Sequence, residues 1–358
     1  MKNNVRIILN ASLLLALISG CTKNDGILDQ TSLKQAINQS AVRLNTTMDA
    51  IVSSKAYSIL TMSDMGVTKS ATVTDSTYRV YIPLDKIKGV YEYNKVTKYN
   101  NWGLSLLHFF TKTGDNSQMI VRMPLKKVTK PWSLRRFSAA DSSLTNNFSI
   151  TVSDYHNNYN SYWDYDYLLS SEISIDGAVA GNLNINTLIS PTKGTHYASQ
   201  YEFAGGYTAK YKFDSGDTTV SSFTILDGNN VLYEEELLKI KNDTARFHRE
   251  HQYIITIGNV QIIRKSDSKT VQIAVNGVIQ PNAVVKIVDN GDEGENDEAS
   301  VCKKRDVQIT FEDGTVTTVS ALIGNSVENI KTLFTSLHQV YFAAYIVDWI
   351  AYDIYYQR

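Results

Sequence analysis

The sequence predicts an α+β protein in which an extensive antiparallel β-sheet is flanked by one helix near each end of the chain. Between about 78 and 320, short runs rich in aromatic and β-branched residues alternate with turn residues. On either side of that region, apolar residues recur at steps of three and four, which is the spacing of one helix face. The loops between neighbouring runs are short, and parallel neighbours would need a crossover of about a dozen residues, so we expect an antiparallel meander. The pattern leaves open whether the sheet is curved or closes partly into a barrel.

The start of the chain has the parts of a secretory signal peptide in their usual order. Basic residues precede an apolar run at 11–18, and Ser19-Gly20 stands directly before Cys21. The run is well below the roughly 20 residues that a helix needs to cross a bilayer. We therefore expect residues 1–20 to be a signal peptide. Two alternatives remain open: Cys21 follows an ordinary signal peptide by chance, or the segment is a buried helix of the mature fold.

The sequence Ser19-Gly20-Cys21 resembles the lipobox of bacterial lipoproteins, in which cleavage leaves an acylated cysteine as the first residue. The resemblance implies that Cys21 is lipidated, that residues 21–31 form a tether, and that the protein contacts a membrane through its lipid anchor. At roughly 0.8 kcal/mol for each buried methylene, two or three acyl chains hold a protein on a membrane almost permanently. In this class an Asp after the cysteine favours the inner membrane, and Thr22 stands there instead. The resemblance therefore implies the cell envelope, at the outer membrane, with the leaflet left open.

The composition narrows the class of protein further. Residues 22–25 and the Asn- and Tyr-rich composition are similar to outer-membrane and surface lipoproteins of the Bacteroidetes. With 43% hydrophobic and 20% charged residues, the chain is globular. Its formal charge of −1 becomes more negative once Lys2 and Arg6 leave with the signal peptide, so we expect no nucleic-acid partner. With Cys21 lipidated, Cys302 is the only other cysteine, so an intrachain disulfide is not expected.

The first element of the folded body is a helix predicted at about 32–54. Ser32 followed by Gln35 matches the capping-box pattern at its start. Its apolar face is formed by Leu33, Ile37, Ala41, Leu44, Met48 and Ile51. We expect this face to cover one side of the sheet, within a β-rich main body that spans 32–290.

The centre of the chain is a series of predicted strands. Early strands are predicted at 78–82, 118–122 and 147–152, and a hairpin loop at 113–116. The later strands are predicted at 172–176, 179–187, 197–204, 206–213, 218–226 and 231–240. Tight turns such as Asp176-Gly177 separate them. The alternation along these strands predicts one face on the core and one more polar face.

Residues 300–358 are predicted to add a β-hairpin and a C-terminal helix that pack on the main body. The hairpin lies at 306–320, and apolar residues at helical spacing follow at 326–354. Asp348 and Asp353 interrupt this apolar helix, and carboxylates are costly inside a membrane, so we do not expect it to span one. Burial within its own fold and docking onto a partner are both compatible with the pattern.

The segment 155–167 has the most distinctive local composition, because aromatic rings are interleaved with Asn and Asp. On glycan-binding surfaces, ring faces stack on the C–H side of a pyranose while short polar side chains bond its hydroxyls. Aromatic residues are also enriched at protein interfaces. We expect a solvent-exposed loop that contacts a glycan or an envelope protein, and the alternative is a loop whose rings fold onto the domain itself. The candidate contact residues are Tyr155, Tyr159, Tyr162, Trp163 and Tyr165.

The sequence contains no recognisable catalytic or cofactor motif. It has no nucleophile elbow, dinucleotide fingerprint or P-loop, so no catalytic residue and no cofactor are assigned. On a strand, His248 and His251 would point to opposite faces and could not share a metal ion. The acidic run at 289–298 does not keep the register of a calcium-binding loop, so no metal ligand is assigned either.

Three functions are compatible with this reading. The first is a lipid-anchored envelope protein with a non-enzymatic binding or structural role. The second is a carrier of a lipid or another apolar ligand in a curved half-barrel, and the third is an envelope hydrolase without a recognisable motif. An apolar cavity beneath the helix at 32–54 would favour the carrier, whereas a filled core with exposed aromatic rings would favour the binding protein.

Overall fold

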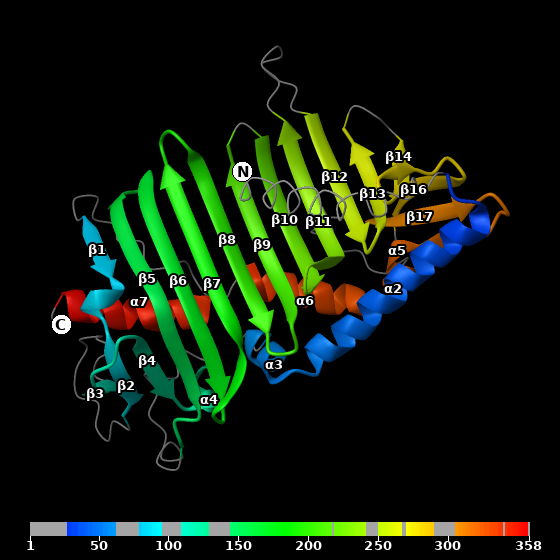
Figure 1. Ribbon diagram of the computed structural model, residues 1–358. Coiled ribbons are helices and arrows are strands. Elements are labelled where there is room, and N and C mark those ends of the chain that lie inside the picture. Colours follow the sequence, from blue (N-terminus) through cyan, green and yellow to red (C-terminus); the bar gives the residue numbers. More distant parts are fainter. Residues whose placement is uncertain are drawn as a thin grey trace, which may run out of the picture.

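The computed structural model describes residues 27–61, 79–94, 109–128, 144–216, 218–240, 250–266, 270–289, 305–338 and 341–356. Within these residues, one large sheet carries helices against one of its faces (Figure 1). This confirms the predicted α+β class, with an antiparallel sheet flanked by an N-terminal helix and C-terminal helices. Several sequence predictions lie outside the described residues: the signal peptide at 1–20, Cys21, the first part of the tether, His248, the acidic run from 290 to 298, and Cys302.

The N-terminal helix α2 spans Gln30–Val52 and has the predicted apolar face. All six predicted positions of that face are buried. Its cap is Asp29, whose carboxylate accepts a hydrogen bond from the backbone N–H of Ser32 at 2.8 Å. The helix begins before Ser32, so the predicted capping box of Ser32 with Gln35 is not at its start. A second, short helix follows as α3 (Lys55–Leu60).

The strands follow the predicted meander closely. The early elements are β1 (Val80–Pro83), η1 (Leu84–Lys86), β2 (Gly89–Tyr93), β3 (Phe110–Gly114), β4 (Met119–Met123) and α4 (Leu125–Val128). The long strands are β5 (Phe148–Ser161), β6 (Asp164–Ile175), β7 (Ala178–Ser190), β8 (Gly194–Phe203), β9 (Tyr207–Ser215), β10 (Thr218–Asp227) and β11 (Asn230–Ile240). The later strands are β12 (Glu250–Ile257), β13 (Val260–Lys265), β14 (Val271–Val275), β15 (Val278–Ile279), β16 (Ala283–Asp289), β17 (Arg305–Phe311) and β18 (Val316–Thr318).

The order of the strands is that of an open sheet. From β5 to β14, each strand pairs antiparallel with the next one along the chain. The other edge of β5 is shared, because β4 pairs with its first half and β1 with its second half. At the far end, β16 pairs with β14 and β17, and β17 pairs with β18. No pairing joins the two ends within the described residues, so this sheet does not close into a barrel.

The predicted hairpin at 113–116 is wrong. Strand β2 lies between β3 and β4, antiparallel to the first and parallel to the second. The connection at 115–118 passes the start of β2, where the N–H of Gly89 donates to the carbonyl of Gln118 at 3.0 Å. Gly89 has a φ of 137°, which only glycine adopts easily. The connection lies at 115–118 rather than 113–116, and a strand from an earlier part of the chain separates the two strands that it joins.

The helix predicted at 326–354 corresponds to two described helices on either side of residues 339–340, which lie outside the described residues. After the short α5 (Val319–Ile323), α6 spans Ser326–His338 and α7 spans Tyr341–Tyr355. Figure 1 shows α6 and α7 crossing one face of the sheet, and α2 packs on α5, α6 and strands β11 to β13. None of the described helices is long and apolar enough to cross a membrane.

The two faces of the sheet differ in character, as the alternation predicts. The helix-facing side carries a buried row across successive strands, formed by Leu183, Tyr201, Ala209, Ile225 and Tyr233. The opposite side carries a polar row on the same strands, formed by Ser170, Asn184, Gln200, Lys210, Thr224 and Glu234. The core therefore lies between the sheet and the helices.

Candidate ligand-contact site on the β5–β6 hairpin

The segment 155–167 is the outer part of a β-hairpin, which corrects the predicted loop. Strands β5 and β6 pair along it, and only Tyr162 and Trp163 lie between them. Asn and Asp are frequent in turns, and their density in this segment favoured a loop. Side chains alternate between the two faces of these strands. Residues such as Asn158 and Asp166 lie on the face away from the helices, and most of the rings lie on the helix-facing side.

The tip of this hairpin presents two exposed rings. Tyr162 is 70% exposed and Trp163 is 68% exposed. Their rings meet edge to face at 5.0 Å between centroids. The neck below them is held by polar contacts, because Asn160 Nδ2 donates to Asp164 Oδ2 at 3.2 Å and the N–H of Trp163 donates to Ser161 Oγ at 3.3 Å. The rings are thus carried on a short turn fixed at both strand ends.

A third exposed ring stands close to this tip. Tyr81 is 59% exposed, and it alternates with the buried Val80 on β1. In the β1–β5 pairing Tyr81 lies opposite Asn158, roughly 10 Å along the strand from the tip. Next to it, His156 Nε2 lies 3.0 Å from Asp166 Oδ1. We call the three exposed rings of this corner of the sheet the aromatic corner: Tyr81, Tyr162 and Trp163.

The rings nearer the middle of the hairpin belong to the core. Tyr155 is 2% exposed and Tyr167 is 4% exposed, while Tyr159 and Tyr165 are half-buried. They pack on one another, with centroids 5.9 Å apart for Tyr155 and Tyr167 and 6.1 Å apart for Tyr165 and Tyr167. Of the five predicted contact residues, Tyr162 and Trp163 are therefore exposed, and the prediction that Tyr155 is exposed is wrong, because α7 covers it.

Helix α7 places one carboxylate against these buried rings. Tyr155 Oη donates a hydrogen bond to Asp348 Oδ1 at 2.9 Å. Burial raises the pKa of the Asp348 carboxyl to about 7, although the tyrosine hydroxyls lower it in part. Burial and the nearby carboxylate hold the pKa of Tyr155 and of Tyr167 well above the ordinary value. Tyr167 Oη also lies near Asp348 and contributes to lowering the pKa of that carboxyl, whereas Asn157 Oδ1 has no hydrogen-bond partner among the described residues.

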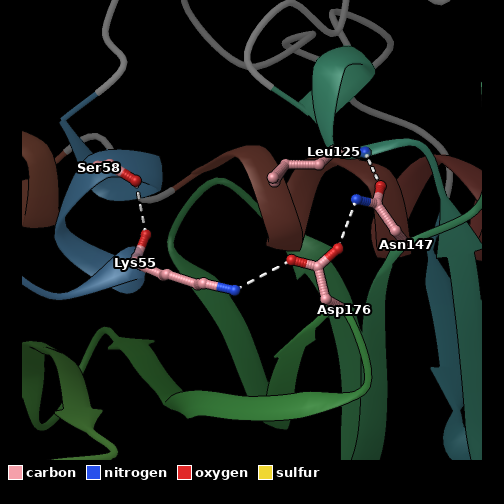
Figure 2. A network of polar contacts seen from close by, with 5 residues as sticks. All are labelled: Lys55, Ser58, Leu125, Asn147 and Asp176. Atoms are coloured by element: carbon pink, nitrogen blue, oxygen red, sulfur yellow. Dashed lines mark hydrogen bonds and ion pairs between the residues drawn. The ribbon is translucent and has the colours of Figure 1, made fainter.

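A polar network fixes the opposite end of the hairpin, where β5 begins and β6 ends (Figure 2). Asp176, in the turn after β6, accepts hydrogen bonds from Asn147 Nδ2 at 2.9 Å and from Lys55 Nζ at 3.0 Å. Asn147 Oδ1 in turn accepts from the N–H of Leu125 at 2.9 Å, and Ser58 Oγ donates to the carbonyl of Lys55 at 2.7 Å. These contacts hold the pKa of the Asp176 carboxyl below its usual value. The network joins α3, α4, β5 and the β6–β7 turn at one point, which we call the base clamp.

The described residues contain no group of three or more His, Cys, Asp and Glu side chains placed to hold a metal ion. The His196 imidazole has Nδ1 2.9 Å from Asp214 Oδ2 and Nε2 2.9 Å from the carbonyl of Lys193. Both of its ring nitrogens therefore have a partner within the protein. The aromatic corner, by contrast, presents three exposed rings.

Sequence reasoning missed two parts of this site. Tyr81 was visible only as one ring in a short strand, and its exposure follows from the β1–β5 register, which joins residues far apart in the chain. Asp348 was noted as an unusual carboxylate in an apolar helix, but nothing local connects it with Tyr155. Comparison with protein-family models, with curated proteins and with solved structures gives no match to this chain. The chemistry of the site itself is therefore the basis for assigning a function.

Proposed function

We propose that this chain is a lipid-anchored envelope protein, held at the outer membrane through Cys21, that binds a glycan without catalysing a reaction. The observation that carries the binding role is the pair of rings at the hairpin tip, Tyr162 and Trp163, which are 70% and 68% exposed on a turn fixed at both ends. Exposed large rings are costly to leave in water, and fixed ones lose little conformational freedom on binding.

The polar surroundings of the rings favour a glycan over a protein. Asn158 lies beside Tyr81, and amides both donate and accept hydrogen bonds, as sugar hydroxyls do. Of the carboxylates of the corner, Asp164 accepts a hydrogen bond from an amide, and Asp166 lies 3.0 Å from an imidazole nitrogen. A neutral, hydroxyl-rich ligand suits such a surface better than a charged one. A stable protein interface buries about 800 Å² on each partner, which is much more than the tip of one hairpin offers.

The packing of α2 supports the binding role over that of an apolar carrier. Leu33, Leu44 and Met48 on its sheet-facing side are fully buried and belong to the same core as the strands beneath. A carrier would need its ligand to occupy the space that these side chains fill. The occupied nitrogens of His196 likewise give an envelope hydrolase no support.

The lipid anchor can be tested with Cys21→Ser. Acylation requires the thiol, so this variant should not incorporate labelled palmitate and should leave the membrane fraction. The unmodified chain, labelled in the same cells, is the control. A variant that keeps both the label and the membrane would remove the anchor from the proposal and leave the binding role standing.

Glycan binding can be tested by screening the detergent-solubilised chain on a glycan array, followed by calorimetry with the strongest hit. The double variant Tyr162→Ala/Trp163→Ala should bind that glycan at least about tenfold more weakly, because losing about 1.4 kcal/mol of contact corresponds to that factor. The matched control is Tyr355→Ala/Tyr356→Ala, which removes another adjacent exposed pair with centroids 5.1 Å apart at the far end of α7. Equal binding by the two double variants would disprove the role of the tip.

A further inference from the structure

The buried side of the β5–β6 hairpin meets α7 at one carboxylate, that of Asp348. The residues that flank it on the same helix face, Ala344 and Ala351, are small and buried. Its hydrogen-bond partner is a neutral phenol, because Tyr155 Oη donates to Asp348 Oδ1 at 2.9 Å. No lysine or arginine of the described residues compensates its charge. Asp348 is half-buried in this contact, and its removal from water favours the neutral acid over the carboxylate.

The titratable groups that face Asp348 are phenols. They are Tyr155 on β5, Tyr167 on β6 and Tyr352 on α7 itself. The pKa of Tyr352 is raised to about 12 by burial and by the Asp348 carboxylate, so these phenols stay neutral while the acid titrates.

The other elements packed on α7 add no compensating charge. Helix α7 also contacts β1 and η1. On η1, Asp85 and Lys86 are exposed, and Asp85 pairs with Lys88 at 2.5 Å. On β1, the ring of Tyr81 is exposed and alternates with the buried side chains that face the core. Burial is the first cause of the raised pKa of Asp348, and no charged group is among the others.

A second observation connects the neutral acid with the packing of the cluster. Asn157 is 2% exposed, and its Oδ1 has no hydrogen-bond donor among the described residues. An ionised carboxylate offers only acceptors, whereas the protonated acid also carries an O–H donor. The hydroxyls of Tyr155 and Tyr352 link Asn157 to Asp348, so the cluster that contains the acid also contains a buried acceptor without a donor.

We infer that protonation of Asp348 sets how firmly α7 docks on the β5–β6 hairpin, tightly as the neutral acid and more loosely as the carboxylate. Looser docking uncovers buried side chains of α7 such as Val347 and Ile350, together with the rings of Tyr155 and Tyr167. The inference does not depend on what the aromatic corner binds.

The sign of the effect follows from the pKa of the carboxyl in the two states. The pKa is about 7 when α7 is docked and has the ordinary value of 3.8 when Asp348 is in water. The docked state therefore binds more protons between these values, so docking weakens as the pH rises from about 4 through 7 and changes little above that. Acid strengthens the contact, which is the opposite of the usual behaviour of an ion-paired carboxylate.

The test compares the whole protein with Asp348→Asn, which keeps the shape of the side chain, cannot ionise and offers an amide donor. Hydrogen exchange of α7 amides is measured at about pH 6 and about pH 8 and corrected for intrinsic exchange. The unmodified protein should lose about tenfold protection over this interval, the factor expected for a pKa of 7. Asp348→Asn should show no such loss. Asp353→Asn, the same change farther along α7, should behave like the unmodified protein.

Two outcomes would overturn the inference. One is an Asp348→Asn variant whose protection falls with pH as much as that of the unmodified protein. The other comes from titrating the Asp348 carboxyl of the unmodified protein by carbon-13 NMR, a measurement that does not depend on whether the variant folds. A midpoint near 7 is expected, and a midpoint near the ordinary 3.8 would show that the docked acid is ionised throughout.

Discussion

The tip and the middle of the β5–β6 hairpin have similar compositions and opposite environments. At the tip, Tyr162 and Trp163 are 70% and 68% exposed, whereas Tyr155 and Tyr167 in the middle are 2% and 4% exposed. Tyrosine is interleaved with Asn and Asp in both parts. The two parts differ in what packs against them. Helix α7 covers the middle of the hairpin, where Asp348 contacts Tyr155, although the two residues are 193 positions apart in the chain.

The difference teaches that the exposure of a ring on a strand is decided by the opposite layer rather than by its neighbours in sequence. The same pattern of rings and amides serves as core where a helix covers it and as a contact surface where the hairpin extends beyond the helix. In this protein one hairpin combines both, so its covered part can fix the position of its exposed part.

The largest expected effect is a difference in stability between substitutions in the middle and at the tip of the hairpin. Tyr155→Ala removes a buried ring and its bond to Asp348, and should lower the free energy of unfolding by about 3–5 kcal/mol. Tyr162→Ala removes an exposed ring and should change it by no more than about 0.5 kcal/mol. Chemical unfolding by guanidinium, followed by far-UV circular dichroism, measures both.

Tyr155→Phe is the matched control for this comparison, because it keeps the ring and removes only the hydroxyl. It should cost about 1–2 kcal/mol, since Asp348 loses its donor but the packing stays. Similar losses for Tyr155→Ala and Tyr162→Ala would contradict the division of the hairpin into a covered and an exposed part.

Much of the sheet could be predicted because its turns are encoded locally. Asp176, Gly177, Gly206 and Gly228 all adopt positive φ, and the sequence marks each of them by an Asp-Gly or Gly-Gly pair. Between such turns the two-residue period gives both the strands and their buried faces. The apolar face of α2 was equally visible, because helical spacing is also a local signal.

The rest could not be predicted because it depends on contacts between distant segments. The insertion of β2 between β3 and β4 leaves no trace in the turn at 115–118. The exposed Tyr81 follows from pairing with Asn158, and the cover on Tyr155 comes from α7. The local composition of 155–167 is typical of a loop. Only the pairing of β5 with β6 shows that most of the segment is strand.

The smallest expected effect concerns the base clamp, which lies a full strand length from the aromatic corner. Asn147→Ala removes the acceptor for the N–H of Leu125 and the donor to Asp176. The half-buried N–H of Leu125 is left without its partner, so the free energy of unfolding should fall by about 1–2 kcal/mol. Asn186→Ala, at an exposed position of β7 with no side-chain hydrogen bond among the described residues, is the control and should be close to neutral. Binding of the array-selected glycan should be unchanged in both variants, because the hairpin is still held by α7. If Asn147→Ala weakens binding while the protein remains folded, the position of the tip depends on the clamp as well as on α7, and the two parts of the hairpin are less independent than the structure indicates.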